Sequence, residues 1–184
     1  MPIKFNLMLI KNTKFKGLKI INGKAFFDNR GFFREIFKKK FFKKHKPIFW
    51  CLSKSKKNVL RGLHIQVKNT QEKFLTVIKG KIIDVVVDLR KNSNTFGQHL
   101  KITLSGKKCN SILIPAGFAH GFLALEKENI VLYSNNNYRS ENHEIGLLWN
   151  DKNLNIKWPN KKLIISSKDK SNISLNEYIK KFCK

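Results

Sequence analysis

Short apolar segments separated by turn residues recur at intervals of about ten residues between residues 59 and 138, a spacing typical of antiparallel β-sheets. Turn-forming pairs such as Lys79-Gly80 and Ser105-Gly106 separate neighbouring segments. No helical pattern lies between them, so the chain is predicted to be all-β, as a sandwich or small barrel, with a jelly roll as the best fit. The predicted strands are residues 59–66, 74–78, 81–89, 100–104, 111–114, 121–125 and 130–134.

The residues of segment 81–89 can be divided between two faces, because side chains of a strand point alternately to opposite sides of a sheet. The face predicted to be core carries Ile83, Val85, Val87 and Leu89. The opposite face carries Ile82, Asp84, Val86 and Asp88.

The end of the chain predicts a helix. Ser174, followed three residues later by Glu177, is a capping-box signature. The apolar residues after this cap fall on one helical stripe, and we expect the helix to pack on the sheets through them. They are Leu175, Tyr178, Ile179 and Phe182.

At 184 residues the chain fits a single domain, residues 1–184. Its formal net charge of +26 first suggests a nucleic-acid or acidic-membrane partner. The lysines, however, are spread from Lys4 to Lys184 and accompany many Asn, Ile and Phe residues. We interpret the charge as a general compositional preference and expect no specific nucleic-acid partner, although an anionic small substrate would be attracted.

The three cysteines, Cys51, Cys109 and Cys183, are widely spaced and odd in number, which indicates neither a disulfide framework nor a cysteine zinc site. A reducing compartment fits this pattern. The chain has no long uninterrupted apolar stretch, and its first ten residues are interrupted by Lys4, unlike a signal peptide. We therefore expect a soluble, cytoplasmic protein with no membrane partner.

Two histidines stand out as candidate reactive groups. His64 follows Arg61 by three positions, so in a regular strand the two side chains would point to opposite faces. Gly62 between them permits a bend. His120 lies among glycines and aromatic residues in the segment 114–122, and we expect both histidines in one pocket. For either one alone, a hydrogen-bonded core histidine is an equally good interpretation.

Metal catalysis is the competing interpretation of these histidines. Small β-barrels often hold a metal through a His-x-His pair, a glutamate and a later histidine. Here the second position of the pair is Gln66, whose neutral amide is a poor transition-metal ligand, and Lys73 would bring a positive charge to the same region. The sequence thus predicts neither a metal nor another cofactor.

Seven segments, in order from about residue 15 to 170, form one pattern: Asp28 to Glu35, Val59 to Gln66, Asp84 to Arg90, Ser93 to Gly97, Ile114 to Phe122, Ile156 to Pro159 and Ser166 to Asp169. This set resembles the dTDP-4-dehydrorhamnose 3,5-epimerase family. The resemblance implies a metal-free, cupin-type jelly-roll barrel with short peripheral helices, a homodimer, and a nucleotide-diphosphate-linked 4-keto-6-deoxyhexose as substrate. The reaction implied is epimerisation at C3, C5 or both.

The resemblance also implies roles for individual residues. His64 matches the catalytic base, Tyr133 the proton donor, and Asp169 the carboxylate that orients the histidine. Lys73 matches a substrate-contacting position and is our first choice to stabilise the enolate formed when a carbon beside the ketone loses its proton. The other positions that match substrate contacts are Arg30, Glu35, Arg61, His120, Glu144 and Lys168.

One departure from the family pattern concerns the substrate. The family typically has Gln-Asp-Asn where this chain has Phe49-Trp50-Cys51, so apolar bulk replaces polar contacts. The proton-transfer residues are untouched, but the nucleotide and the sugar substituents stay open. Two rival functions stay open as well: a single-centre epimerase or 3,4-ketoisomerase on the same scaffold, and a non-catalytic sugar-nucleotide-binding or nucleic-acid-binding module.

Overall fold

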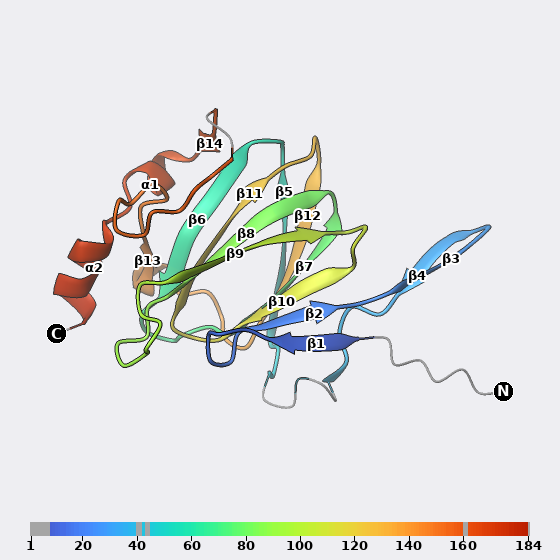
Figure 1. The fold of residues 1–184 in the computed structure, drawn as a ribbon, viewed down its shortest axis with the longest axis horizontal. Helices are drawn as coiled ribbons and strands as arrows, with labels where there is room; N and C mark the ends of the chain where they lie inside the picture. The colour runs from blue at the N-terminus through green and yellow to red at the C-terminus, as the bar shows by residue number, and fades with distance from the viewer. Residues whose placement is uncertain (1–7, 40–41, 43–44, 160–161, 184) are drawn as a thin grey trace.

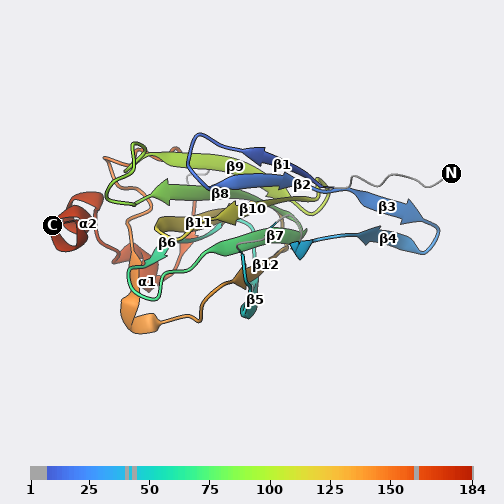
Figure 2. The same cartoon turned by 90° about the horizontal axis from the view of Figure 1, so that it is seen from below.

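Two β-sheets face each other and form the body of the protein in a computed structural model, which describes residues 8–39, 42, 45–159 and 162–183 (Figures 1 and 2). The strands of the first sheet lie in the order β1 (Leu9–Asn12), β2 (Lys19–Asn22), β10 (Asn110–Ile114), β7 (Lys73–Lys79), β12 (Asn129–Asn135) and β5 (Phe49–Ser55). The second sheet has the order β13 (Glu144–Gly146), β6 (Val59–Gln66), β11 (Phe118–Ala124), β8 (Lys81–Asp88) and β9 (His99–Ser105).

The remaining elements are short and peripheral. The strand β14 (Ile164–Ile165) pairs in parallel with β6, and β3 (Ala25–Asp28) and β4 (Gly31–Arg34) form a separate hairpin. The helices are η2 (Glu141–His143), α1 (Ser167–Lys170) and α2 (Leu175–Phe182). The predicted all-β fold with short helices and a C-terminal helix is confirmed. No helix among the described residues has the length and apolar character needed to cross a membrane.

The predicted strands after residue 59 are present, and β7 and β8 are joined at Gly80, which has a φ of +85°. A side chain there would be strained, and its Cβ would lie 2.4 Å from the carbonyl oxygen of Glu128. The five strands before residue 59 were not predicted. The strands β1 to β4 have only four residues each, and lysines lie within β1, β2 and β5, so the sequence shows no clean alternation there.

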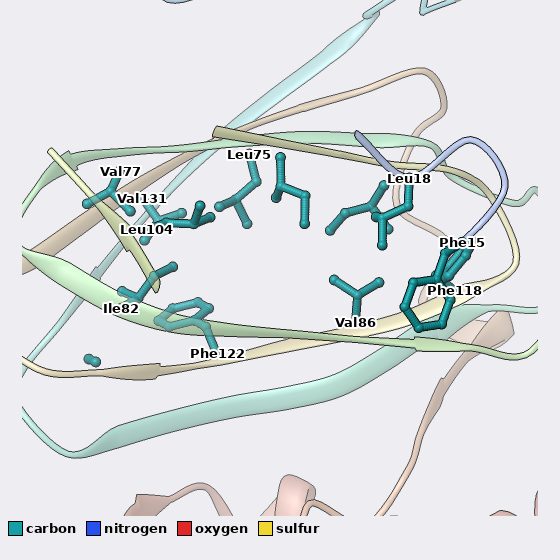
Figure 3. Packing of buried hydrophobic residues seen from close by; sticks show 13 residues of the cluster. Phe15, Leu18, Leu75, Val77, Ile82, Val86, Leu104, Phe118, Phe122 and Val131 are labelled. Carbon is teal, nitrogen blue, oxygen red and sulfur yellow. The ribbon is translucent and has the colours of Figure 1, made fainter. Parts of the chain in front are cut away.

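The main core fills the space between the two sheets (Figure 3). Leu75 and Val77 from the first sheet face Ile82, Val86 and Phe122 from the second, and all five side chains are fully buried. Burying a side chain of this size contributes about 1.5–3 kcal/mol relative to leaving it exposed. The core thus holds the two sheets together.

Both faces of β8 are buried, not only the face predicted to be core. Val85 and Val87 pack outside the second sheet against the C-terminal segment, whereas Ile82 and Val86 belong to the core between the sheets. Asp84 shares this inner face. The outer face of β8 is buried because the C-terminal segment packs on it in a second hydrophobic cluster and shields it from solvent.

The C-terminal helix α2 lies over this outer face of the second sheet (Figure 1). Ser174 and Glu177 form the predicted capping box. Of the predicted apolar stripe, Leu175 and Tyr178 are buried, but Ile179 and Phe182 are exposed. The helix therefore packs through half of its apolar stripe.

Candidate active site

His64 and Asp169 form a hydrogen-bonded pair at the centre of the site. Nε2 of His64 lies 2.6 Å from Oδ1 of Asp169, which α1 carries, and the backbone N–H of Gly62 donates to Oδ2 at 3.3 Å. Burial by itself would raise the pKa of Asp169, but the hydrogen bonds from His64, Gly62 and Ser166 hold it below its ordinary value. An ionised carboxylate only accepts hydrogen bonds, so Nε2 of His64 carries a proton and Nδ1 is the nitrogen that can take one.

The predicted bend at Gly62 is confirmed, and it brings Arg61 and His64 to the same cavity. Gly62 has a φ of +110°, a conformation that other residues rarely adopt. A Cβ at this position would lie 2.6 Å from the Cα of Gly121 on the neighbouring strand β11. The pairing of β6 with β11 shifts by one residue at this point, so alternation no longer separates Arg61 from His64.

A cavity of about 520 Å³ opens beside this pair, between the ends of the two sheets. Strands β5, β7 and β12 of the first sheet form one wall, and β6 and β11 of the second sheet form the other. The structure brings together eight of the ten predicted site residues there: Arg61, His64, Lys73, His120, Tyr133, Glu144, Lys168 and Asp169.

Tyr133 and Lys73 belong to the wall opposite His64, on the paired strands β12 and β7. The hydroxyl of Tyr133 lies 3.1 Å from Oγ of Ser53, which fixes its direction. Burial raises the pKa of Tyr133 and lowers the pKa of Lys73, since in both cases it disfavours the charged form. The wall therefore presents a phenol that keeps its proton and a lysine that gives its proton up more easily than usual.

His120 is paired with a carboxylate that was not predicted as a site residue. Its Nε2 lies 2.7 Å from Oδ2 of Asp84, and both side chains are buried. Oδ1 of Asp84 is buried without a hydrogen-bond partner among the described residues. Alternation places Asp84 on one face with Ile82 and Val86, but only the structure shows that this face is the inner one, where a buried carboxylate needs a partner.

Glu144 and Lys168 form an ion pair of 2.6 Å at the rim of the cavity. Arg139, which was not predicted, also donates to Glu144 at 3.2 Å. Burial alone would raise the pKa of Glu144, but the hydrogen bonds from Arg139 and Lys168 lower it to about 2. The rim thus keeps a fixed anion between two cations at neutral pH.

Arg30 and Glu35 are the two predicted site residues that do not line the cavity. Arg30 is exposed at the tip of the β3–β4 hairpin and bonds Asp28 at 2.6 Å. Glu35 follows β4 and pairs with Lys38. In Figure 1 the hairpin extends from the body on the side opposite α2.

The apolar departure at residues 49–51 lies directly at the cavity. Phe49 and Cys51 line it together with Ser53, whereas Trp50 on the other side of the strand is exposed. Burial raises the pKa of the Cys51 thiol, so this position presents a neutral group. An apolar ring and a thiol therefore form part of the substrate-facing wall.

Gln66 does not line the cavity, and its side-chain amide is hydrogen-bonded to backbone groups. Its amide nitrogen donates to the carbonyl of Asn69 at 2.7 Å, and its amide oxygen accepts from the N–H of Ser140 at 2.9 Å. Within the described part of the chain, no three His, Cys, Asp or Glu side chains come together in a group able to hold a metal ion. Metal independence remains a prediction.

The sequence model of a family described as dTDP-4-dehydrorhamnose 3,5-epimerase matches residues 12–177. The chain belongs to the dTDP-4-dehydrorhamnose 3,5-epimerase family. A dTDP-4-dehydrorhamnose 3,5-epimerase from Salmonella typhimurium is 41% identical over 170 residues, which cover 89% of this chain and 93% of that protein. The resemblance drawn from the sequence segments is thereby confirmed.

Solved structures of epimerases share this fold. A dTDP-6-deoxy-D-glucose-3,5-epimerase from Legionella pneumophila, in complex with dTDP-4-keto-L-rhamnose, is 38% identical with a TM-score of 0.88, covering 92% of this chain and 93% of that one. A 4-keto-6-deoxy sugar epimerase of novobiocin biosynthesis from Streptomyces spheroides is 27% identical with a TM-score of 0.91, covering 96% and 92%. This member of the dTDP-4-dehydrorhamnose 3,5-epimerase family is therefore a sugar-nucleotide epimerase, an isomerase.

Proposed function

We propose that the protein epimerises C3, C5 or both in a dTDP-linked 4-keto-6-deoxyhexose, with His64 as base and Tyr133 as acid. The observation that carries this proposal is the placement of the His64–Asp169 pair and Tyr133 on opposite walls of one cavity, with Lys73 beside Tyr133. Inverting a carbon requires a proton to leave one face of the sugar and another to arrive on the opposite face. Two walls carrying a base and an acid meet this requirement.

In the first step, Nδ1 of His64 takes the proton from the carbon next to the ketone. The electron pair of the broken C–H bond moves onto the ketone oxygen and forms an enolate. The Lys73 ammonium, desolvated in the cavity wall, stabilises the negative charge on that oxygen more strongly than a solvated cation would. Asp169 stabilises the imidazolium that His64 has become, because Nε2–H donates to its carboxylate.

In the second step, the hydroxyl of Tyr133 delivers a proton to the other face of the same carbon. Burial keeps this phenol protonated, and the contact with Ser53 holds its direction. The enolate electron pair forms the new C–H bond and the ketone returns. Solvent then reprotonates the Tyr133 phenolate and takes the proton from His64, so the chain needs no co-reactant.

The experiment that tests this proposal is incubation of the purified protein with dTDP-4-keto-6-deoxyglucose in deuterated water, with NMR locating the deuterium. We expect deuterium at C3, C5 or both, in an inverted product. Transfer of the ketone to C3 would instead identify a ketoisomerase. Binding without any exchange would identify a non-catalytic module. Running UDP-linked and dTDP-linked sugars side by side tests whether Phe49 and Cys51 have changed the nucleotide preference.

We also propose a homodimer in which the β3–β4 hairpin packs on a second copy of the chain. Phe27, Phe32 and Phe33 of the hairpin are exposed, and so are Trp50 and Leu52 on the edge strand β5. An apolar hairpin and an apolar sheet edge on the same chain are complementary between two copies. Such packing would also carry Arg30 away from its own chain and towards the partner, where its guanidinium suits a pyrophosphate.

The proposed compartment is the cytoplasm. Cys51, Cys109 and Cys183 are all free thiols, in agreement with a reducing environment.

A further inference from the structure

His45 connects the two strands that carry Lys73 and Tyr133, from the side of the first sheet that faces away from the cavity. Its ring is only 1% exposed. Nδ1 lies 2.7 Å from Oε1 of Glu72, and Nε2 lies 3.0 Å from Oγ of Ser134. A carboxylate accepts hydrogen bonds, so Nδ1 donates to Glu72 and Nε2 accepts from the hydroxyl of Ser134.

Each partner of His45 is the chain neighbour of a proposed catalytic residue. Glu72 immediately precedes Lys73, and Ser134 immediately follows Tyr133. Alternation along a strand therefore places Ser134 on the back of the sheet while Tyr133 faces the cavity. His45 thus forms a bridge behind the pair of side chains that act on the substrate.

The ladder of backbone hydrogen bonds ends close to this bridge. Lys73 is the first residue of β7 and pairs with Asn135, the last residue of β12. Beyond them, the N–H of Glu72 donates to Oδ1 of Asn136 at 2.8 Å. The start of β7 is therefore held to β12 by side chains as well as by the ladder, and His45 supplies the link on the back face.

The arrangement resembles a serine, histidine and carboxylate triad, but its environment excludes nucleophilic catalysis. Ser134 and His45 are both buried, and neither lines the cavity. The rings of Phe37 and Phe42 lie on this back face, with Phe37 edge-on to His45 at 5.9 Å and stacked with Phe42 at 4.9 Å. A substrate in the cavity meets the other side of the sheet, so the bridge acts only through its neighbours.

We propose that His45 is a positioning residue that fixes the separation between Lys73 and Tyr133. The inference rests on the proposed function, in which Lys73 must meet the ketone oxygen while Tyr133 meets the adjacent carbon. Both contacts become strongest in the transition state, so an error in their spacing lowers kcat more than it weakens substrate binding. Catalytic groups tolerate displacements of only about 0.5 Å.

The test compares two serine deletions in the same sheet. Ser134→Ala removes the hydroxyl that bonds His45. Ser111→Ala removes a buried hydroxyl of β10 that bonds Thr76 of β7 at 2.8 Å and takes no part in the His45 bridge. We expect Ser134→Ala to lower kcat by about tenfold or more with KM changed by less than about threefold. Ser111→Ala should lower the melting temperature similarly and leave kcat unchanged.

Two substitutions of His45 complete the design. His45→Phe removes both hydrogen bonds and keeps the ring, so kcat should fall as in Ser134→Ala. His45→Gln keeps an amide N–H for Glu72 and an amide oxygen for Ser134, and should recover most of the loss. Because all three residues form one bridge, the His45→Phe/Ser134→Ala double variant should be no slower than the slower single variant.

The inference is overturned if the parent protein is active and folded Ser134→Ala retains its kcat. Equal losses of kcat in Ser134→Ala and Ser111→Ala would also overturn it, since that result marks a general effect of stability. A parent protein that shows neither exchange nor inversion overturns the proposed function itself, which keeps the two failures distinct.

Discussion

Nε2 of His64 lies 2.6 Å from Oδ1 of Asp169, although the two residues are 105 positions apart in the chain. The contact links strand β6 to the short helix α1, which follows β14, a strand that pairs in parallel with β6. The C-terminal part of the chain therefore completes a site whose base belongs to the middle of the sequence.

This contact predicts a graded loss of activity. His64→Ala should lower the rate of deuterium exchange at the sugar carbons by a factor on the order of 10²–10⁴, because the base is gone. Asp169→Asn should be milder but still severe, since an amide does not hold the same tautomer. Calorimetry with dTDP should give nearly parental affinities for both variants. Near-parental exchange in folded His64→Ala would assign the base to another residue.

Deprotonation of Lys73 should set the alkaline limit of the pH profile of kcat/KM. Burial lowers the pKa of Lys73 below its usual value of about 10.4 and raises that of Tyr133, so the lysine loses its proton first as pH rises. As pH rises, deuterium exchange should therefore decline at a lower pH than an ordinary lysine would set, both in the parent and in Tyr133→Phe. Lys73→Arg should have lower activity but no such decline, because arginine stays protonated. A decline that survives in Lys73→Arg would belong to another group.

Protonation of Glu144 in acid should lower the stability of the protein. Its folded-state pKa of about 2 lies below its unfolded value, so its contribution is complete above pH 4.5 and is lost as pH falls towards 2. Glu144→Gln should lower the free energy of unfolding by roughly 1–3 kcal/mol at pH 7 and flatten the loss between pH 4.5 and 2. Urea unfolding at several pH values measures this. The exposed neighbour Glu141 serves as control, and Glu141→Gln should match the parent.

The exposed phenylalanines of the β3–β4 hairpin lead to a prediction about dimer formation. Phe32→Glu places a charge on the exposed apolar surface of β4 and should convert the proposed dimer to a monomer with little activity, as measured by sedimentation and epimerase assay. Phe182→Glu on α2, at the other end of the molecule (Figure 1), is the matched control and should remain dimeric. A monomeric parent, or a dimer that survives in Phe32→Glu, would contradict the role given to the hairpin.

The sequence predicted the strands in which polar and apolar residues alternate and turns are marked by glycine. The turn at Gly80 and the bend at Gly62 could both be predicted, because glycine adopts backbone conformations that residues with a side chain disfavour. Local sequence singled out His64 and His120 as residues of one pocket, and the resemblance to the epimerase family added roles for the predicted residues that meet in the cavity.

Other features depend on contacts between distant segments, and no local pattern reports them. Asp84 becomes a site residue only because β11 places His120 beside it. The outer face of β8 is buried only because the C-terminal segment covers it. His45 gains its role from Glu72 and Ser134, which are 27 and 89 positions away.

The central claim is that the base and the acid act from opposite walls of one cavity, and Tyr133→Phe tests it most directly. This change keeps the ring and deletes only the donor hydroxyl. In deuterated water the variant should still exchange substrate hydrogen through His64, yet form little inverted product, so NMR should find deuterium mainly in substrate of unchanged configuration. Inversion at the parental rate would show that another group or water is the donor. Loss of exchange together with inversion would make Tyr133 part of enolate formation and contradict the division of roles.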